Sequence, residues 1–413
     1  MQLAKNTDFV RTKKIAKDNS YSELLTKYVG NIKSMSTSTA VQYKCELNNF
    51  ANFVYRTYGY NIDGLVNKIL HNDNQNNKST FDPYDVLSKY TAHLIGTIAP
   101  TTVKHRILTI KNFFEYCDIE ISPRKFRLKV RLPKSIRKEK EPLSKEDIVV
   151  ILNACSTIRL KTYVMLLAAT GMRASEAVSI RICDLDMESN PSRLFIRGEY
   201  TKTKSDRTVL LTQEVARQLK YWLEYKYRTR RVSFYDKNTY KSTYEYRTPS
   251  KVNNDLIFSM NASSRGHLSV SIQSLYVEFA FAFGKTLERL GRGQKEESPG
   301  AQHRKITLHS MRRFVYSTIA DLGFSDYANF FIGHAGSTYY RKSEKEKAEI
   351  FRKIEPYLTF LDYEELERKG ADIASQLEEK DRMIQNMMQK QEQFEHLIQS
   401  LIDSGQLKPN ISA

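Results

Sequence analysis

Apolar residues recur at helical spacing through the first third of the chain. From Tyr21 to Tyr116 they fall three and four positions apart, which places them on one face of each helix. The clearest run is Tyr43, Leu47, Phe50, Phe53 and Val54. A polar, Asn-rich stretch at 71–83 breaks the pattern and predicts a loop. The sequence therefore predicts a small helical bundle over residues 20–123.

A second helical domain is predicted to begin at Leu143. Ser144 stands three residues before Asp147 and precedes the apolar run IVVIL, a capping-box pattern. Further helices are expected from 160 to 170, from 173 onward, from 214 to 227, and then to about Leu361, with short strands at RLFIRG and RTVLLT. The predicted fold class is mainly α with a small β-hairpin, and the domain spans residues 143–362.

The segment 124–142 joins the two predicted domains and is strongly basic. Between Arg124 and Lys140 it holds nine Lys or Arg residues and one Glu. Cations alternate there with four apolar residues, which favours an extended strap along a phosphate backbone: Phe126, Leu128, Val130 and Leu132. The alternative is a solvated tether that only aids solubility.

The stretch from Tyr227 to Pro249 is an insertion rich in Tyr, Lys, Arg and Thr, with little apolar periodicity. It is expected to be irregular. Interleaved aromatic and basic residues can stack on bases or contact phosphates, whereas the plainer alternative is a flexible loop.

A C-terminal helix is predicted over residues 365–404. Its heptads place these residues at the a and d positions: Leu377, Ile384, Gln391 and Ile398 at a, and Ile373, Lys380, Met387, Phe394 and Leu401 at d. A short coiled coil is one interpretation. The other is a single amphipathic helix packed on its own domain.

Charge narrows the class of partner. Lys and Arg number 65 against 47 Asp and Glu, so the net charge is +18 and a polyanion is expected. No apolar run approaches the roughly 18 residues that span a bilayer, which argues against membrane insertion. The basic N-terminus lacks the apolar core of a signal peptide, so a cytoplasmic protein is expected. Four cysteines without a CxxC pair suggest neither disulfides nor zinc.

Four short motifs carry candidate chemistry. They are ATGMRASEAVSI with Arg173, EYTKTKSDRTVLLT with Lys202, LHSMRRF with His309 and Arg312, and IGHAGSTYYRK with His334. His309 and Arg312 are neighbours on one helix face at spacing i, i+3. Together the motifs supply cations, proton donors and a tyrosine, the groups that phosphoryl transfer without a metal requires.

In this order the motifs resemble those of the tyrosine recombinase, or integrase, family. The resemblance covers most of the chain and makes residues 20–123 similar to the family's core-binding domain and 143–362 to its catalytic domain. It implies catalytic roles for Arg173, Lys202, His309, Arg312 and His334, with Glu176 supporting Arg173 and Lys204 as the alternative lysine.

The resemblance places the nucleophilic tyrosine less directly. The family usually has it about nine residues after the Gly-His histidine, whereas Tyr339 and Tyr340 follow His334 by five and six residues. The string STYYRKSEKE resembles a variant in archaeal integrases. On that resemblance Tyr340 is the preferred nucleophile and Tyr339 the alternative.

The resemblance implies a site-specific DNA recombinase that forms a 3′-phosphotyrosyl intermediate, without metal or other cofactor. It implies a homotetramer on paired sites in double-stranded DNA and integration or excision of a mobile element. Three alternatives share parts of this pattern: a chromosome-dimer resolvase, a type IB topoisomerase and a catalytically inactive DNA-binding regulator.

Overall fold

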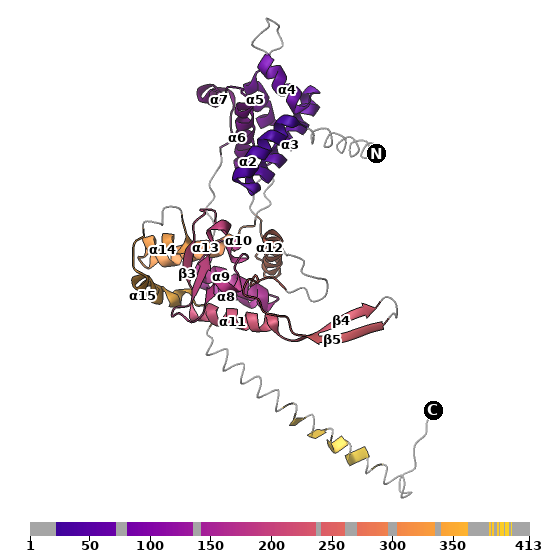
Figure 1. Cartoon of the computed structure of the whole chain (residues 1–413), viewed down its shortest axis with the longest axis vertical. Coiled ribbons are helices and arrows are strands. Elements are labelled where there is room, and N and C mark those ends of the chain that lie inside the picture. The colour runs from indigo at the N-terminus through magenta and orange to yellow at the C-terminus, as the bar shows by residue number, and fades with distance from the viewer. Residues whose placement is uncertain are drawn as a thin grey trace, which may run out of the picture. The chain divides into compact units, whose positions relative to one another are not determined.

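The computed structural model describes residues 22–71, 81–134, 142–236, 241–260, 271–295, 304–334 and 340–361, with separate positions between 380 and 398. For 233–236 and 241–243 only the backbone is described. The chain forms two compact units, Met1–Lys140 with Lys295–Lys305 and Glu141–Gln294 with Ile306–Ala413. Most described residues are helical and the sheets are small and antiparallel (Figure 1), which confirms the predicted fold class.

The first unit is a helical bundle. Its helices are α2 (Glu23–Met35), α3 (Thr37–Tyr58), α4 (Ile62–Leu70), α5 (Pro83–Leu94), α6 (Pro100–Tyr116) and α7 (Pro123–Lys129). Phe50 of α3 and Phe114 of α6 are fully buried and meet edge to face at 5.8 Å. The buried Glu46 of α3 accepts a hydrogen bond from Thr109 of α6 at 2.6 Å. Apolar burial and this buried bond together hold α3 against α6.

The expected extended strap is wrong for its first part. Residues Pro123–Lys129 form the helix α7, in which Pro123 occupies the first position. Phe126 and Val130 are buried in the core of the first unit, whereas Leu128 is 64% exposed, so only two of these apolar positions serve that core. The alternation that suggested a strand arises because basic residues occupy the solvent side of a short helix. Residues 135–141 of the predicted linker lie outside the described residues.

The second unit contains both sheets and eight α-helices that the structure describes in full. The helices are α8 (Lys145–Asn153), α9 (Ile158–Thr170), α10 (Ala174–Ala177), α11 (Gln213–Tyr227), α12 (Ile272–Arg289), α13 (Leu308–Asp321), α14 (Ser325–Ile332) and α15 (Glu344–Ile354). The 3₁₀ turns are η2 (Ile182–Asp184), η3 (Gly198–Tyr200) and η5 (Glu355–Leu358). Ser144 and Asp147 form the predicted capping box at α8.

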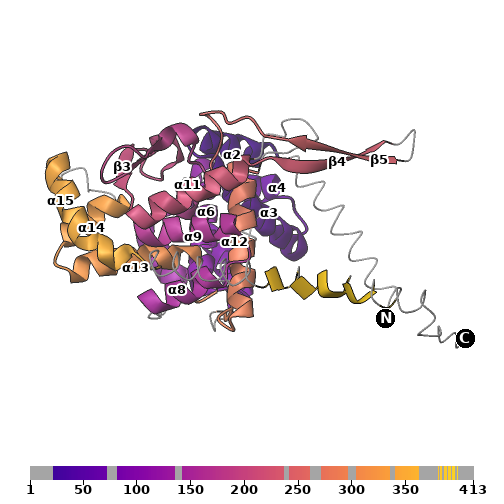
Figure 2. The ribbon, with the colours of Figure 1, turned by 90° about the horizontal axis from the view of Figure 1, so that it is seen from below.

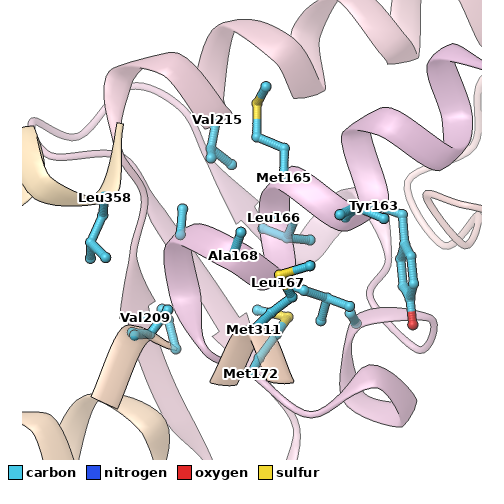
Figure 3. Packing of buried hydrophobic residues seen from close by; sticks show 14 of the residues in the cluster. Tyr163, Met165, Leu166, Leu167, Ala168, Met172, Val209, Val215, Met311 and Leu358 are labelled. Atoms are coloured by element: carbon cyan, nitrogen blue, oxygen red, sulfur yellow. The ribbon is translucent and has the colours of Figure 1, made fainter. Parts of the chain in front are cut away.

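Helix α9 lies at the centre of this unit. All residues from Tyr163 to Thr170 are buried, so the helix is covered on every side. Side chains from α11, α13 and the sheet pack around it (Figure 3). Gly171 ends α9 with φ +62°, and a Cβ there would lie 2.9 Å from Cγ2 of Ile332. Glycine at this position therefore allows α14 to approach the end of α9.

The small sheet has the order β1-β2-β3 and is antiparallel. Its strands are β1 (Leu185–Asp186), β2 (Arg193–Ile196) and β3 (Arg207–Leu210). Leu194 of β2 pairs with Val209 of β3, and both are buried. The predicted hairpin is therefore present. Its connection, residues 197–206, carries the candidate lysine.

The insertion after α11 is not irregular. It forms a two-stranded antiparallel ribbon, β4 (Arg230–Asp236) and β5 (Lys241–Arg247), with register pairs from Arg230↔Arg247 to Asp236↔Lys241. The ribbon projects from the second unit in both views (Figures 1 and 2). Two strands can pair through backbone hydrogen bonds without an alternating apolar pattern when both faces of the ribbon stay largely exposed. The hydrophobic pattern of the sequence therefore did not reveal the ribbon.

The predicted C-terminal helix lies mostly outside the described residues. The positions described between 380 and 398 are helical, and the apolar ones among them are exposed: Met383, Met387, Phe394 and Ile398. The coiled coil stays a prediction. None of the described helices is both long and apolar enough to cross a membrane.

A buried carboxylate joins α11 to the segment after η5. Glu214 is 1% exposed, and its two oxygens accept the backbone N–H groups of Phe360 at 2.9 Å and Leu361 at 2.6 Å. Burial raises the pKa of Glu214 above its ordinary value, although these two donors oppose the rise. This contact fastens the segment after η5 onto α11.

We expect Glu214→Ala to destabilise the second unit by roughly 2 kcal/mol, because it leaves two buried N–H groups unpaired. Trp222 of α11 is buried and is the only tryptophan in the chain, so its fluorescence reports urea unfolding of this unit. Glu214→Gln keeps one acceptor oxygen and should lose less. An alanine variant that unfolds at the wild-type urea midpoint would contradict this account.

Candidate active site

Arg173 stands at the junction of α9 and α10, where it is the N-cap residue of α10. Its backbone N–H donates to Oε2 of Glu176 at 3.0 Å, and its Nη1 donates to Oε1 at 2.7 Å. The Glu176 side chain is completely buried, whereas Arg173 stays partly exposed. The carboxylate therefore holds both the backbone and the guanidinium of Arg173 while leaving part of that guanidinium accessible.

Arg207, the first residue of β3, binds the same carboxylate. Its Nη2 lies 2.6 Å from Oε2 of Glu176 and its Nη1 lies 3.4 Å from Oε1. Burial alone would raise the pKa of Glu176, but the bonds and charge of Arg207 and Arg173 hold it below its ordinary value. Glu176 is therefore a carboxylate shared by two arginines from different elements.

The guanidinium of Arg207 also lies against Gly333, the residue after α14. A Cβ at Gly333 would come within 2.8 Å of Cζ and Nε of Arg207, and Gly333 has φ +71°. Glycine is therefore required here both by the close approach and by the left-handed backbone. Through this contact Arg207 links Glu176 to the turn that carries His334.

Arg312 reaches the same place from α13. It is 3% exposed, and its Nη1 donates to the carbonyl oxygens of Gly171 at 2.8 Å and Ile332 at 2.5 Å. One of these acceptors is two residues before Arg173 and the other is two residues before His334. Arg312 thus ties the ends of α9 and α14 together.

The buried Nη2 atom of Arg312 has no hydrogen-bond partner among the residues that the structure describes. Burial, followed by the charge of Arg173, lowers the pKa of Arg312 to about 10, so it is still a cation at neutral pH. Arg312 thus adds a third guanidinium close to the two that bind Glu176, so three positive charges face one carboxylate. A local excess of positive charge with an unused buried donor suits an anion such as a phosphate.

His334 lies at the edge of this cluster. Its Nδ1 is 2.9 Å from Oδ1 of Asn329, which can only accept, so Nδ1 carries the proton. Burial lowers the pKa of His334, and the charges of Arg312 and Arg173 lower it further. The imidazole is therefore neutral at pH 7, with Nε2 available as a proton acceptor.

Two predicted residues lie on the surface near these elements. Lys202 is exposed in the turn between η3 and β3, five residues before Arg207. His309 is exposed in the first turn of α13, one turn before the buried Arg312. The structure thus brings Arg173, Arg312 and His334 together, and it attaches Lys202 and His309 to elements that hold the cluster.

Tyr340 packs on a different surface. Its half-buried ring stacks on Phe330 at 5.1 Å and lies 5.8 Å from Tyr327, both on α14. Burial raises the pKa of Tyr340, with smaller contributions from Asp326 and Glu346. The alternative nucleophile, Tyr339, lies outside the described residues. In this arrangement the described contacts of Tyr340 are aromatic.

The sequence did not single out Arg207 as a functional residue. Its signal was present in the stretch RTVLL, which served only to position Lys202 by counting. An arginine that opens a strand is ordinarily a solvated residue. Only the fold places it against Glu176 and Gly333.

Comparison with known proteins gives a consistent result. Residues 141–255 match the phage integrase family. The chain is 30% identical over 123 residues to tyrosine recombinase XerA of Saccharolobus solfataricus, which covers 30% of this chain and 38% of the relative. It is 27% identical over 213 residues to tyrosine recombinase XerC of Chlamydia caviae, covering 48% and 64% of the two chains. The chain thus matches less than two thirds of the length of these relatives.

Among solved structures, the chain is similar to a lambda integrase dimer bound to a COC′ core site. The identity is 12%, the TM-score is 0.49, and 78% of this chain and 98% of the other are covered. In its matched domain and in its sequence relatives, this chain is thus similar to phage integrases and tyrosine recombinases.

Proposed function

We propose that this protein is a site-specific DNA recombinase that breaks and rejoins DNA through a 3′-phosphotyrosyl intermediate. The observation that carries this proposal is the cluster of Arg173, Arg207 and Arg312 around the single carboxylate of Glu176, with Nη2 of Arg312 unpaired among the described residues. A phosphodiester gains negative charge in the transition state of its cleavage, and the positive charge of this cluster would stabilise that transition state. The similarity to phage integrases and tyrosine recombinases supports the same assignment.

In the proposed reaction the tyrosine oxygen attacks the phosphorus of a DNA phosphodiester. Arg173 and Arg312 bind the nonbridging oxygens, for which guanidinium geometry is well suited. The tyrosine proton passes to Nε2 of His334, because the neutral imidazole carries its own proton on Nδ1. His309 hydrogen-bonds the phosphate, and Lys202 gives a proton to the departing 5′-oxygen. One ester is exchanged for another, so the bond energy is conserved for rejoining.

The proposed nucleophile is Tyr340. Its ring packs on Phe330 and Tyr327, and we propose that Tyr340 leaves these contacts when its hydroxyl attacks the phosphate. Leaving the aromatic contacts exposes apolar surface. DNA binding would have to supply that free energy, which would keep cleavage coupled to binding.

We also propose a homotetramer on paired duplex sites, acting in the cytoplasm on a mobile element. Exchange between two duplexes cuts four strands, and each tyrosine stays attached to the strand it has cut. One nucleophile for each of the four strands gives four protomers. Residues of the first unit would bind the DNA on which the catalytic unit acts.

A catalytically inactive DNA-binding regulator is the second candidate, because Tyr340 packs against α14 and its described contacts include none of the cluster arginines. The two functions differ in one product, a covalent protein–DNA adduct. A pool of nicked duplexes with a randomised central sequence would trap this adduct. Cleavage near the nick releases a short DNA fragment, and because the fragment diffuses away, the cut strand cannot be rejoined. DNA that stays bound to denatured protein identifies an active enzyme, and its sequence identifies the site.

Arg173→Ala and Arg312→Ala should each slow adduct formation by at least about 100-fold while DNA affinity changes little, because they act on charge that develops in the transition state. Single-turnover kinetics and anisotropy measure the two quantities separately. Arg312→Lys keeps a buried positive charge and serves as the control for loss of folding. Trp222 fluorescence checks that each variant is folded. Wild-type cleavage by either alanine variant would remove that residue from the mechanism.

Tyr340→Phe should eliminate the adduct, because it removes only the attacking oxygen, whereas Tyr339→Phe should reduce adduct formation modestly. Peptide mapping of the trapped wild-type adduct identifies the attached residue directly. An adduct on Tyr339 would exchange the two assignments. Full activity in both variants would exclude this tyrosine pair as the nucleophile.

Arg207→Ala should slow adduct formation by roughly 100-fold through misplacement of Glu176, Arg173 and the His334 turn, with affinity for DNA nearly unchanged. Arg207→Lys should recover only part of the rate, because an ammonium group cannot reproduce the two-pronged contact. Arg197→Ala is the matched control, since Arg197 makes a similar pair with Asp184 at 2.9 Å outside the cluster. An equal loss in the control would mean that Arg207 contributes only general stability.

A further inference from the structure

The β4–β5 ribbon has two unlike faces. Because side chains alternate across a strand, Arg231 lies on one face with its register partner Tyr246 and its diagonal neighbour Tyr244. Val232 lies on the other face with its partner Glu245, and Val232 is buried. Near the base of the ribbon, one face therefore turns toward the rest of the protein, and the other face turns toward solvent.

The solvent face is aromatic and cationic. Tyr244 is 57% exposed and Tyr246 is 74% exposed. The guanidinium of Arg231 lies 3.6 Å from the ring centre of Tyr244. No acidic residue occurs among the described side chains of this face. Tyrosine hydroxyls and guanidinium groups donate readily to phosphate oxygens, and aromatic rings with arginine contact nucleic acids well.

Charge over the whole segment favours a polyanion. Residues 228–247 contain six basic and two acidic side chains. One acid, Glu245, is on the opposite face and pairs with Arg247 at 2.9 Å. A purely apolar partner would leave these cations without counterions, so the face suits DNA better than an apolar protein surface.

The base of the ribbon is fastened firmly to the end of α11. Nη2 of Arg230 donates to the carbonyl of Lys226 at 2.8 Å, and Nζ of the buried Lys226 donates to the carbonyl of Leu256 at 2.7 Å. The hydroxyls of Thr229 and Thr248 are 2.7 Å apart across the two ends. A fixed base lowers the entropy lost when the ribbon meets a partner.

We propose that the exposed face of the β4–β5 ribbon is a second DNA-binding surface, which contacts duplex DNA away from the bond that is cut. The ribbon projects away from α14, whose C-terminal end leads to His334 (Figures 1 and 2). A two-stranded ribbon has the width that the major groove admits, and Arg231, Tyr244 and Tyr246 would face the groove or its flanking phosphates. The choice of DNA as partner rests on the proposed function.

The test uses the full-length protein and random-sequence duplexes of about 15 and about 60 base pairs, with affinity followed by anisotropy across a salt series. One variant combines Arg231→Ala with Tyr246→Ala. A second replaces residues 230–247 by two glycines, which the short distance between Thr229 and Thr248 permits. The matched control combines Lys353→Ala with Tyr357→Ala, an exposed basic and aromatic pair on α15 and η5.

We expect the deletion to weaken binding of the long duplex by about tenfold or more and to affect the short duplex much less. Each lost phosphate contact should reduce the log-log salt slope by about 0.9. The control should bind as the wild type does. Wild-type affinity and slope in the deletion variant would overturn the proposal, as would a change in the oligomeric state of DNA-free protein with DNA affinity unaltered.

Adduct trapping separates this proposal from the proposed function. An adduct in wild-type protein together with ribbon-independent binding would refute only the ribbon surface. Ribbon-dependent binding without any adduct would refute the recombinase activity and leave the ribbon as a DNA-binding surface.

Discussion

The candidate site depends on one buried carboxylate shared by two arginines. Glu176 has no exposed side-chain surface, and it contacts Arg173 at the N-cap of its own helix and Arg207 on a strand 31 residues later. An isolated buried carboxylate would be costly, but two guanidinium groups and a backbone N–H supply its partners. Because the arginines outnumber the acid, charge remains to bind an anion. The pair thus both orders the site and makes it electropositive.

Buried main-chain groups complete the arrangement. Arg312 donates to carbonyl oxygens at the ends of α9 and α14, so one side chain fixes the distance between the turns that carry Arg173 and His334. Gly171 and Gly333 make this geometry possible, since each has a positive φ and each is closely approached by a side chain. Precise placement of the cations is therefore a property of helix packing in the second unit.

The two DNA-directed proposals differ in how they use charge. In the candidate active site the cations are buried or half-buried around Glu176, where a low dielectric strengthens their action on a phosphate. On the β4–β5 ribbon the cation and tyrosines are exposed, so their contribution to binding is screened by salt. The first arrangement suits transition-state stabilisation, and the second suits affinity for the DNA backbone.

The sequence by itself determined the mainly helical class, the capping box at Ser144 and the helix end at Gly171, because these depend on local periodicity and on backbone groups within a few residues. It also singled out Arg173, Arg312 and His334 through short motifs. Tertiary structure decided what local patterns cannot encode. Phe126 and Val130 became core residues, the insertion became a ribbon, and Arg207 met Glu176 and Gly333. These outcomes depend on long-range packing and strand pairing, in which each residue is placed by partners distant along the chain.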